Sequence, residues 1–334
     1  MLPKELMKGA LRFQDLPRIP VFPLCISWWA FDHFGYTVMD VFKNPEKGVD
    51  AQLKTSAILN FDAIESFWDW YCILEPLGCK MQIKDKGSPL VLDMPPIKDP
   101  EDLKNMGMPD LNENWRVNSA LKSARLLKEK ADDYYLFGTF LGPFSLAGML
   151  FGLENLLLET IERPDFVHDL MEYSKTVLLK QANLYAPYLD AIMYCDPSAS
   201  GDLISPKATK TFLIPCLKKL NQETKNLGID VLNHICGNTT GTLDLIAGLD
   251  ADAFSLDFKV DLTAAREKLT DRMALIGNIE PSFLLDAKSS ELEKLSREAL
   301  SRAGQKGFIL SPGCDVPLES PIENVKTLID VTNN

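Results

Sequence analysis

The chain has 334 residues and a formal net charge of −12, with 25% charged and 46% hydrophobic residues. The acidic balance argues against a surface that binds nucleic acid or an anionic membrane. The sequence shows no membrane-spanning apolar run and no signal-peptide core, and its seven cysteines have no regular spacing, so we expect reduced thiols in a cytoplasmic protein.

Short apolar segments alternate with helical segments along most of the chain. A helix is expected over residues 2–14, and another over 44–60, where Asn44 can cap the helix and Pro45 suits its first turn. Residues 79–92 alternate around Lys86-Gly87-Ser88 and predict a hairpin. Further helices are expected at 115–130, 145–159, 164–188, 206–227, 242–248, 290–303 and 321–331. The eight strand candidates are 18–24, 63–67, 135–141, 191–195, 229–235, 253–256, 273–276 and 308–310.

Eight strands separated mostly by helices predict parallel pairing and closure into a distorted (β/α)8 barrel, the TIM-barrel fold. We expect one domain over residues 1–334, with an N-terminal helical and hairpin extension and a hairpin and loop insertion at about 72–115. A doubly wound open sheet is the alternative. It would need a glycine-rich phosphate loop after the first strand, where the sequence reads Cys25-Ile26-Ser27-Trp28-Trp29 instead.

Polar side chains follow most of the predicted strands. In a barrel, the carboxyl ends of the strands meet at one mouth, where active sites lie. We therefore expect these residues to gather at the same end of the molecule: Asp196, His234, Cys236, Asp257, Asn278, Glu280 and Cys314.

His234 and Cys236 suggest half of a zinc site. Two residues apart in a strand, their side chains point to the same side, just before a glycine turn. Cys314, which follows the last strand, is the best third ligand, with Cys25 and Cys195 in reserve. Three protein ligands leave one zinc position open, as in a catalytic site. The alternative is that the histidine and cysteines are buried core residues.

The other candidates have two interpretations each. Asp196 and Asp257 could bind substrate or transfer a proton, or they could cap turns, and Asp257 could also be a fourth zinc ligand. The aromatic cluster after the first strand, which includes Trp28 and Trp29, could line a pocket or seal one end of the core.

Several segments resemble the uroporphyrinogen decarboxylase superfamily over most of the chain, most strongly over residues 190–331. They are Asp196-Pro197, Ser200-Gly201-Asp202-Leu203-Ile204-Ser205-Pro206, His234-Ile235-Cys236-Gly237-Asn238, Gly277-Asn278-Ile279-Glu280-Pro281, Gly313-Cys314-Asp315-Val316-Pro317 and Pro321-Ile322-Glu323-Asn324. Within that superfamily, the His-x-Cys pair and the late cysteine resemble the zinc-dependent methylcobamide:thiol methyltransferases of the coenzyme M type. The resemblance implies a distorted (β/α)8 barrel with His234, Cys236 and Cys314 as zinc ligands.

The resemblance also implies a reaction. The sulfur of a small thiol such as coenzyme M, bound to zinc, attacks the methyl group of a methylated corrinoid that a carrier protein presents at the mouth. Trp28, Trp29 and Asn278 are the expected corrinoid contacts, and Asp196 and Asp257 are the expected catalytic carboxylates.

Three other functions remain open. The protein could methylate Co(I) from a methylated substrate, decarboxylate a tetrapyrrole, or bind corrinoid or zinc without catalysis. True uroporphyrinogen decarboxylases carry an arginine-rich segment after the first strand, whereas residues 25–30 contain no arginine. Decarboxylation is therefore the weaker alternative.

Overall fold

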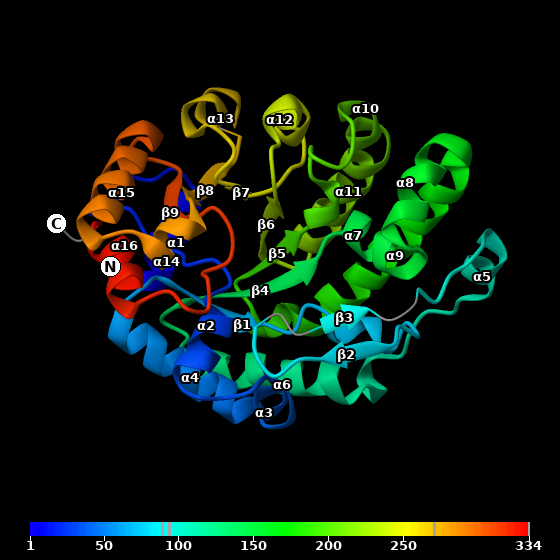
Figure 1. Cartoon of the computed structure of the whole chain (residues 1–334), viewed down its shortest axis with the longest axis horizontal. Coiled ribbons are helices and arrows are strands. Elements are labelled where there is room, and N and C mark those ends of the chain that lie inside the picture. Colours follow the sequence, from blue (N-terminus) through cyan, green and yellow to red (C-terminus); the bar gives the residue numbers. More distant parts are fainter. Residues whose placement is uncertain (88–89, 93–94, 270–271, 333–334) are drawn as a thin grey trace.

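The computed structural model describes residues 1–87, 90–92, 95–269 and 272–332, and its centre is a curled sheet of seven parallel strands (Figure 1). Each strand pairs with the next along the chain, apart from a separate hairpin. The strands are β1 (Ala63–Phe67), β4 (Tyr135–Leu141), β5 (Ala191–Cys195), β6 (Asp230–Ile235), β7 (Ala253–Leu256), β8 (Ala274–Ile279) and β9 (Phe308–Pro312). The prediction of a TIM-barrel-like α/β fold is confirmed.

The predicted first strand, residues 18–24, is wrong as a strand. This segment makes a single parallel bridge between Val21 and Leu310 of β9. The backbone nitrogen of Phe22 donates to Leu310, and on the other side the nitrogen of Asp62, just before β1, donates to Val21. Pro20 and Pro23 lack an N–H, so a longer ladder cannot form. The gap between β9 and β1 is therefore spanned by one bridging segment instead of an eighth strand.

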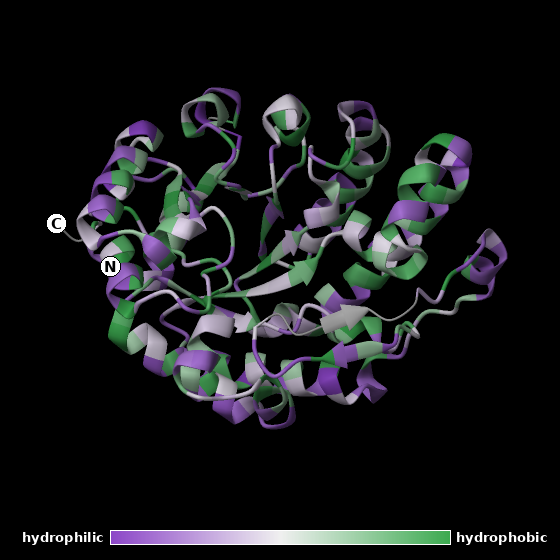
Figure 2. Ribbon diagram, in the orientation of Figure 1, coloured by the Kyte–Doolittle hydropathy of each residue, from purple (hydrophilic) through white to green (hydrophobic). Residues whose placement is uncertain are grey.

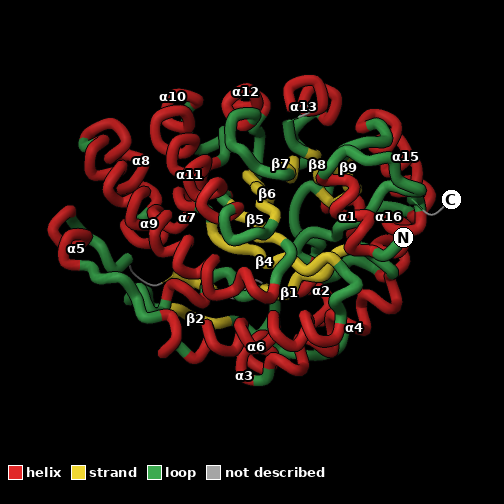
Figure 3. The backbone as a smooth tube through the Cα atoms, turned by 180° about the vertical axis from the view of Figure 1, so that it is seen from behind, coloured by secondary structure: helices red, strands yellow, loops and turns green. Residues whose placement is uncertain are grey.

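Helices surround the strands on the outside, as the view from behind shows most clearly (Figure 3). Their bounds are α1 Pro3–Leu11, α2 Ile26–His33, α3 Val38–Lys43, α4 Pro45–Leu59, α5 Pro100–Asn105, α6 Trp115–Lys130, α7 Pro143–Phe151, α8 Leu153–Glu162, α9 Pro164–Tyr185, α10 Pro206–Ala208, α11 Ile214–Lys225, α12 Leu243–Ile246, α13 Leu262–Leu269, α14 Pro281–Asp286, α15 Ser289–Ala303 and α16 Ile322–Asp330. Hydrophilic and hydrophobic residues both occur along these outer helices (Figure 2).

The hairpin is present as β2 (Met81–Ile83) and β3 (Leu90–Leu92), which pair antiparallel in a sheet of their own. Of the predicted turn Lys86-Gly87-Ser88, only Ser88 lies outside the described residues.

Two predicted long helices are interrupted. Residues 145–159 fall in two helices, α7 and α8, which bend by 103° at Gly152, where φ is 89°. Residues 206–227 contain a π-helical turn, Thr209–Leu213, just before Pro215, which has no N–H to donate. In the described part of the chain, no single helix is long and apolar enough to cross a membrane. The bent pair α7–α8 has that length and composition only when taken together.

The core has two parts. One lies inside the barrel and is built from alternate residues of the strands, since successive side chains point to opposite faces. Its members include Ala63, Tyr135, Phe137, Met193, Cys195, Leu232, Ile276 and Ile309. Met7, Ala10 and Leu11 of α1 join this interior cluster. The second and larger part packs between the sheet and the outer helices.

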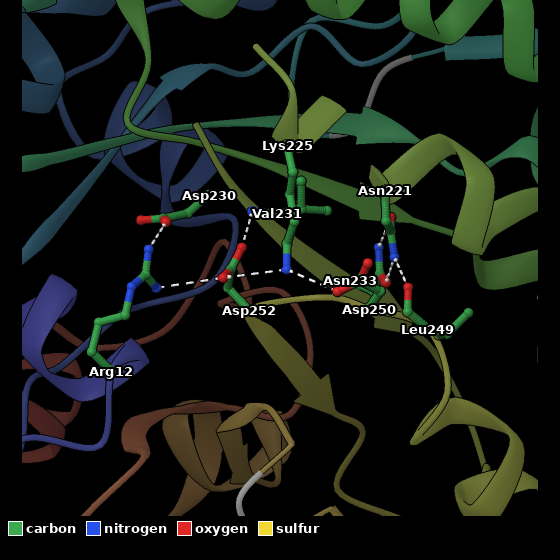
Figure 4. Close-up of polar contacts among 9 residues, drawn as sticks. All are labelled: Arg12, Asn221, Lys225, Asp230, Val231, Asn233, Leu249, Asp250 and Asp252. Atoms are coloured by element: carbon green, nitrogen blue, oxygen red, sulfur yellow. Dashed lines mark hydrogen bonds and ion pairs between the residues drawn. The ribbon is translucent and has the colours of Figure 1, made fainter. Parts of the chain in front are cut away.

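Ion pairs also hold helix α1 against the amino ends of the strands. Lys4 and Lys8 lie four residues apart on one face of α1, and Arg12 follows the last residue of the helix. Lys4 and Lys8 are 3.2 and 3.3 Å from the carboxylate of Asp190, just before β5. Figure 4 shows Arg12 reaching both Asp230 of β6 and Asp252 before β7, the latter at 3.4 Å. This end of the barrel is therefore closed, which leaves the carboxyl ends of the strands for a functional site.

Candidate metal centre

His234, Cys236 and Cys314 come together at the carboxyl end of the barrel. His234 lies near the end of β6, Cys236 follows that strand, and Cys314 follows β9. One nitrogen of His234 and the sulfurs of both cysteines all lie within 4.8 Å of one another. The contact between His234 Nε2 and Cys236 Sγ measures 3.2 Å. Three ligand atoms at this spacing can surround a single metal ion.

Two glycines allow the turns that carry the cysteines. Gly237 follows Cys236 with a φ of 78°, and its N–H donates to Asp257 Oδ2 at 2.7 Å. Gly313 precedes Cys314, and its N–H donates to the carbonyl of Ile279 at 2.7 Å. A Cβ on Gly313 would clash with the backbone of Phe258. The position of Cys314 therefore depends on a close approach that only glycine permits.

Contacts from the next strand orient the His234 ring. Nδ1 lies 3.1 Å from the carbonyl oxygen of Ser255 and 3.0 Å from its hydroxyl oxygen. A carbonyl can only accept, so Nδ1 carries the proton in the neutral ring and Nε2 is left with its lone pair toward the cysteines. This arrangement, with the outer nitrogen bound to a backbone carbonyl, is typical of a metal-ligating histidine.

The two sulfurs compete for one proton. The hydrogen bond from Cys236, aided by His234, lowers the pKa of Cys314 well below that of an ordinary thiol. The same hydrogen bond, together with burial, raises the pKa of Cys236. Burial opposes protonation of His234, but the hydrogen bond and negative charge of Cys314 outweigh it and raise the His234 pKa. A buried imidazole beside a thiolate and a thiol is a donor set that fits zinc, which would displace the shared proton.

Asp196 lies at the end of β5, but its carboxylate is hydrogen-bonded to the first turn of α7. It accepts hydrogen bonds from the backbone nitrogens of Phe144 and Ser145, at 3.1 and 2.6 Å, and from the Ser145 hydroxyl at 2.6 Å. Burial raises its pKa to about 6 against the effect of these bonds. These contacts are those of a cap on the first turn of α7, and a catalytic role for Asp196 stays a prediction.

Asp257 supports the metal centre from outside. Its two oxygens accept from the backbone nitrogens of Gly237, at 2.7 Å, and Lys259, at 2.8 Å. The carboxylate therefore holds the turn after Cys236, and it is not among the three residues whose ligand atoms converge. Its roles as a catalytic residue or fourth ligand stay predictions.

Trp28 and Trp29 are buried side chains, and their role in corrinoid binding stays a prediction. Trp28 and Trp29 in α2 are only 6% and 2% exposed. The ring nitrogen of Trp29 donates to the carbonyl of Ser320 at 2.8 Å, and Trp28 packs edge-on against Phe31 and Phe42. These contacts are typical of rings that seal one end of the core.

Asn278 lies at the mouth, but its side-chain nitrogen donates to the carbonyls of Asp257 and Val260, at 3.1 and 2.8 Å. It thereby holds the loop between β7 and α13. It also lines a cavity of about 380 Å³ together with Phe258, Lys259, Glu280 and Arg302. Its role in corrinoid binding stays a prediction. The reserve ligands Cys25 and Cys195 are buried and lie outside the converging group.

Two acidic residues near the centre were not singled out from the sequence. Asp315 directly follows Cys314, and Glu65 is a charged residue in an otherwise uncharged, fully buried strand, Ala63–Phe67. That charge within a strand was the available signal for Glu65, whereas its surroundings depend on tertiary structure.

The chain is similar to known proteins over nearly its whole length. The family profile described as Uroporphyrinogen decarboxylase (URO-D) matches residues 2–334. Methylcobamide:CoM methyltransferase MtbA of Methanosarcina acetivorans is 27% identical, covering 99% of this chain and 98% of the relative. Methylcobamide:CoM methyltransferase MtaA of Methanosarcina barkeri is 28% identical, covering 98% and 96%. A solved methyltransferase from Methanosarcina mazei shares the fold, with a TM-score of 0.90 at 23% identity, covering 100% of this chain and 98% of the other.

Proposed function

Because this chain belongs to the uroporphyrinogen decarboxylase family, we propose that it is a zinc-dependent methyltransferase that moves a methyl group from a methylated corrinoid to a small thiol such as coenzyme M. The observation that carries the proposal is the convergence of His234, Cys236 and Cys314 within 4.8 Å at the mouth of the barrel. The likeness to two proteins named methylcobamide:CoM methyltransferase supports it. By the same likeness, we propose a corrinoid carrier protein as the partner.

Zinc at this centre would hold the sulfur of the substrate thiol at its open position and keep it deprotonated and nucleophilic. The chain supplies the ligands in suitable protonation states. His234 offers a neutral Nε2, fixed by the contact of Nδ1 with Ser255. Cys236 and Cys314 offer two thiolates whose charges cancel that of a divalent ion. A third thiolate, from the substrate, would give the centre a single net negative charge. This charge would keep the substrate sulfur electron-rich and favour its attack on a methyl group.

Two exposed apolar side chains near the mouth offer a contact surface for the corrinoid in addition to the predicted tryptophans. Leu203, after β5, is 49% exposed, and Phe258, after β7, is 37% exposed. Lys259 and Asp202, the neighbours of these two residues, form an ion pair at 2.9 Å. The two apolar side chains therefore stand on adjoining loops beside the turns of Cys236 and Cys314. We assign them to contact with the flat corrinoid, whose methyl group has to come within about 3–3.5 Å of the attacking sulfur.

Decarboxylation of a tetrapyrrole receives less support. Its substrate carries many carboxylates and requires free arginines at the mouth. Arg18, the arginine of the first segment, binds Asp62 with both terminal nitrogens, at 2.8 and 2.6 Å. Asp62 precedes β1, so this pair lies at the amino end of the strands and away from the mouth.

The direct test is metal analysis followed by a thiol assay. The purified protein should contain about one zinc per chain, and the zinc-loaded protein should demethylate free methylcobalamin when a thiol is added. Removal of zinc by a chelator should abolish the reaction, and restoring zinc should recover it. A metal-free protein that decarboxylates a tetrapyrrole would contradict the proposal. We propose a cytoplasmic location, because all seven cysteines are free thiols, which suits a reducing compartment.

A further inference from the structure

Glu65 is a buried carboxyl group with no cationic partner among the described residues. It is 1% exposed and lies in β1. Its side chain points the same way as that of Ala63, which belongs to the cluster inside the barrel. Burying a carboxylate without a positive charge is costly, and buried carboxyls of this kind are concentrated at functional sites. The reaction as described so far gives Glu65 no role.

Hydroxyl groups surround both oxygens of Glu65. Thr139 Oγ1 lies 2.6 Å from Oε1, and Ser27 Oγ donates to Oε2. Ser27 itself accepts from Gln52 Nε2, so its proton is free to point at Glu65. The hydroxyl of Thr139 can either donate or accept. The carboxyl can therefore exist with or without a proton and keep both hydrogen bonds.

Cys195 links Glu65 electrostatically to the metal centre. Burial raises the pKa of the Cys195 thiol, and the charges of Asp315, Glu65 and Cys314 raise it further. Cys195 therefore lies among all three groups, and it pairs in register with the ligand His234. The charge of Asp315 interacts with both Cys314 and Glu65. Glu65 and the metal centre therefore border the same interior cluster, which contains Ala63 and Cys195, and Glu65 is not itself a ligand.

We propose that Glu65 accepts the proton that the substrate thiol gives up when it binds at the metal centre. This inference rests on the proposed function. The S–H bond breaks, an O–H bond forms on the Glu65 carboxylate, and the negative charge moves from oxygen to sulfur. After the methyl group has moved to sulfur and the cobalt has kept the electron pair of its carbon bond, the neutral thioether leaves. Glu65 then returns its proton to solvent, which completes the balance.

The physical reason for a proton acceptor inside the protein is that the net charge of the buried site then stays the same. If the thiol proton went to water, the buried site would gain a full negative charge beside Asp315, at a high desolvation cost. If the proton goes to Glu65, the charge of the site does not change. Burial raises the pKa of Glu65 to about 7, against the hydrogen bonds of Ser27 and Thr139 and with a contribution from Asp315. The group is therefore ionised in part of the neutral range and ready to accept.

The pH range in which Glu65 can accept the thiol proton follows from its pKa of about 7. Below a pH of about 6, Glu65 is already protonated and cannot accept, so the thiol proton must leave the protein. Above about 7, Glu65 is ionised in the free protein and captures the proton. The other titratable groups facing it are Asp315 after β9, Cys25 before α2 and Cys195 in β5. Burial raises the pKa of both cysteine thiols, so these stay neutral across this range. Burial also raises the pKa of Asp315 to about 6, so Asp315 is ionised at the upper end of the window.

The test counts protons released when 2-mercaptoethanol binds to the zinc-loaded protein, using a pH indicator in weak buffer. Wild type should release about one proton per bound thiol at a pH of about 6 and well under one at about 7.5. Glu65→Gln should release about one at both. Asp230→Asn, which removes a carboxylate from the opposite end of the barrel, should behave like wild type. Equal release by wild type and Glu65→Gln at a pH of about 7.5 would overturn the role of Glu65.

A measurement on the wild-type protein covers the case in which Glu65→Gln fails to fold. The infrared difference spectrum at a pH of about 7.5, with and without thiol, should show the band of a protonated carboxyl appearing on binding. Absence of that band overturns the role of Glu65. A zinc-loaded protein that binds no thiol at all would instead contradict the proposed function, so the two failures are distinguishable.

Discussion

The Nδ1 atom of His234 lies 3.1 Å from the backbone carbonyl of Ser255 on the neighbouring strand β7. This contact decides which ring nitrogen faces Cys236 and Cys314, because the carbonyl accepts only the Nδ1 proton. The pairing of β6 with β7, which places His234 opposite Ser255, therefore sets the chemistry of the candidate ligand.

Ser255→Ala tests whether the carbonyl or the hydroxyl is the partner that matters. The substitution removes the hydroxyl at 3.0 Å but leaves the carbonyl at 3.1 Å. We expect zinc content and affinity to stay within about threefold of wild type, since the orienting hydrogen bond remains. Competition with a chelator measures the affinity. A loss of tenfold or more would show that the hydroxyl orients the ring.

Gly313→Ala should damage the metal centre through the backbone. A Cβ at this position would clash with Phe258, so the turn that carries Cys314 has to shift. We expect weaker zinc binding and a stability loss of about 1–3 kcal/mol. Gly107→Ala is the matched control, because its Cβ would meet open space. Metal analysis and denaturant unfolding of both variants provide the comparison, and unchanged zinc in Gly313→Ala would contradict this account of the turn.

Trp29→Ala separates a core role from a binding role. Because the ring is 2% exposed and donates to Ser320, its removal should cost about 3–5 kcal/mol of stability. Leu203→Ala and Phe258→Ala should instead leave the melting temperature nearly unchanged and raise KM for methylcobalamin while leaving KM for the thiol unchanged. Ile161→Ala is the control for loss of an exposed apolar side chain, since Ile161 is 83% exposed on α8. The assignment fails if Leu203→Ala and Phe258→Ala match this control.

Asp196 gives a prediction about pH. Burial raises its pKa from an ordinary 3.8 to about 6 in the folded protein. The ionised carboxylate is therefore disfavoured by folding, and the folded state binds the proton more tightly than the unfolded state does. Its contribution to stability is fully present below a pH of about 4 and is lost as the pH rises through about 6. The difference in unfolding free energy between wild type and Asp196→Asn should shift in favour of wild type as the pH falls across this window. A constant difference would contradict the raised pKa.

Much of the sheet could be predicted from the sequence. The strands at 135–141, 191–195 and 253–256 have the predicted bounds, because a strand buried on both faces is a continuous apolar run that ends at polar or glycine residues. The same regularity placed His234 and Cys236 on one side of a strand, and the fold brings Cys314 to them.

Other features depend on tertiary contacts that no local pattern contains. The segment at 18–24 has the composition of a strand, but its prolines limit it to one bridge. Helix α2 is mostly apolar and has little amphipathic periodicity, so the sequence did not decide whether its tryptophans line a pocket or seal the core. The surroundings of Glu65 come from four separate segments, with Ser27, Gln52, Thr139 and Asp315 brought together only by the fold.

The measurement that tests the central claim most directly is the zinc content of Cys314→Ser beside that of Cys216→Ser. Cys314 belongs to the converging group, whereas the Cys216 sulfur interacts with the carbonyl of Met171 at 3.4 Å. A serine hydroxyl does not ionise to replace a thiolate, so Cys314→Ser should lose most of its zinc and nearly all thiol methylation. Its far-UV spectrum should stay that of wild type, because the barrel core does not depend on a metal at its mouth. Cys216→Ser should keep both zinc and activity. Full zinc and full activity in Cys314→Ser would contradict the three-residue metal centre.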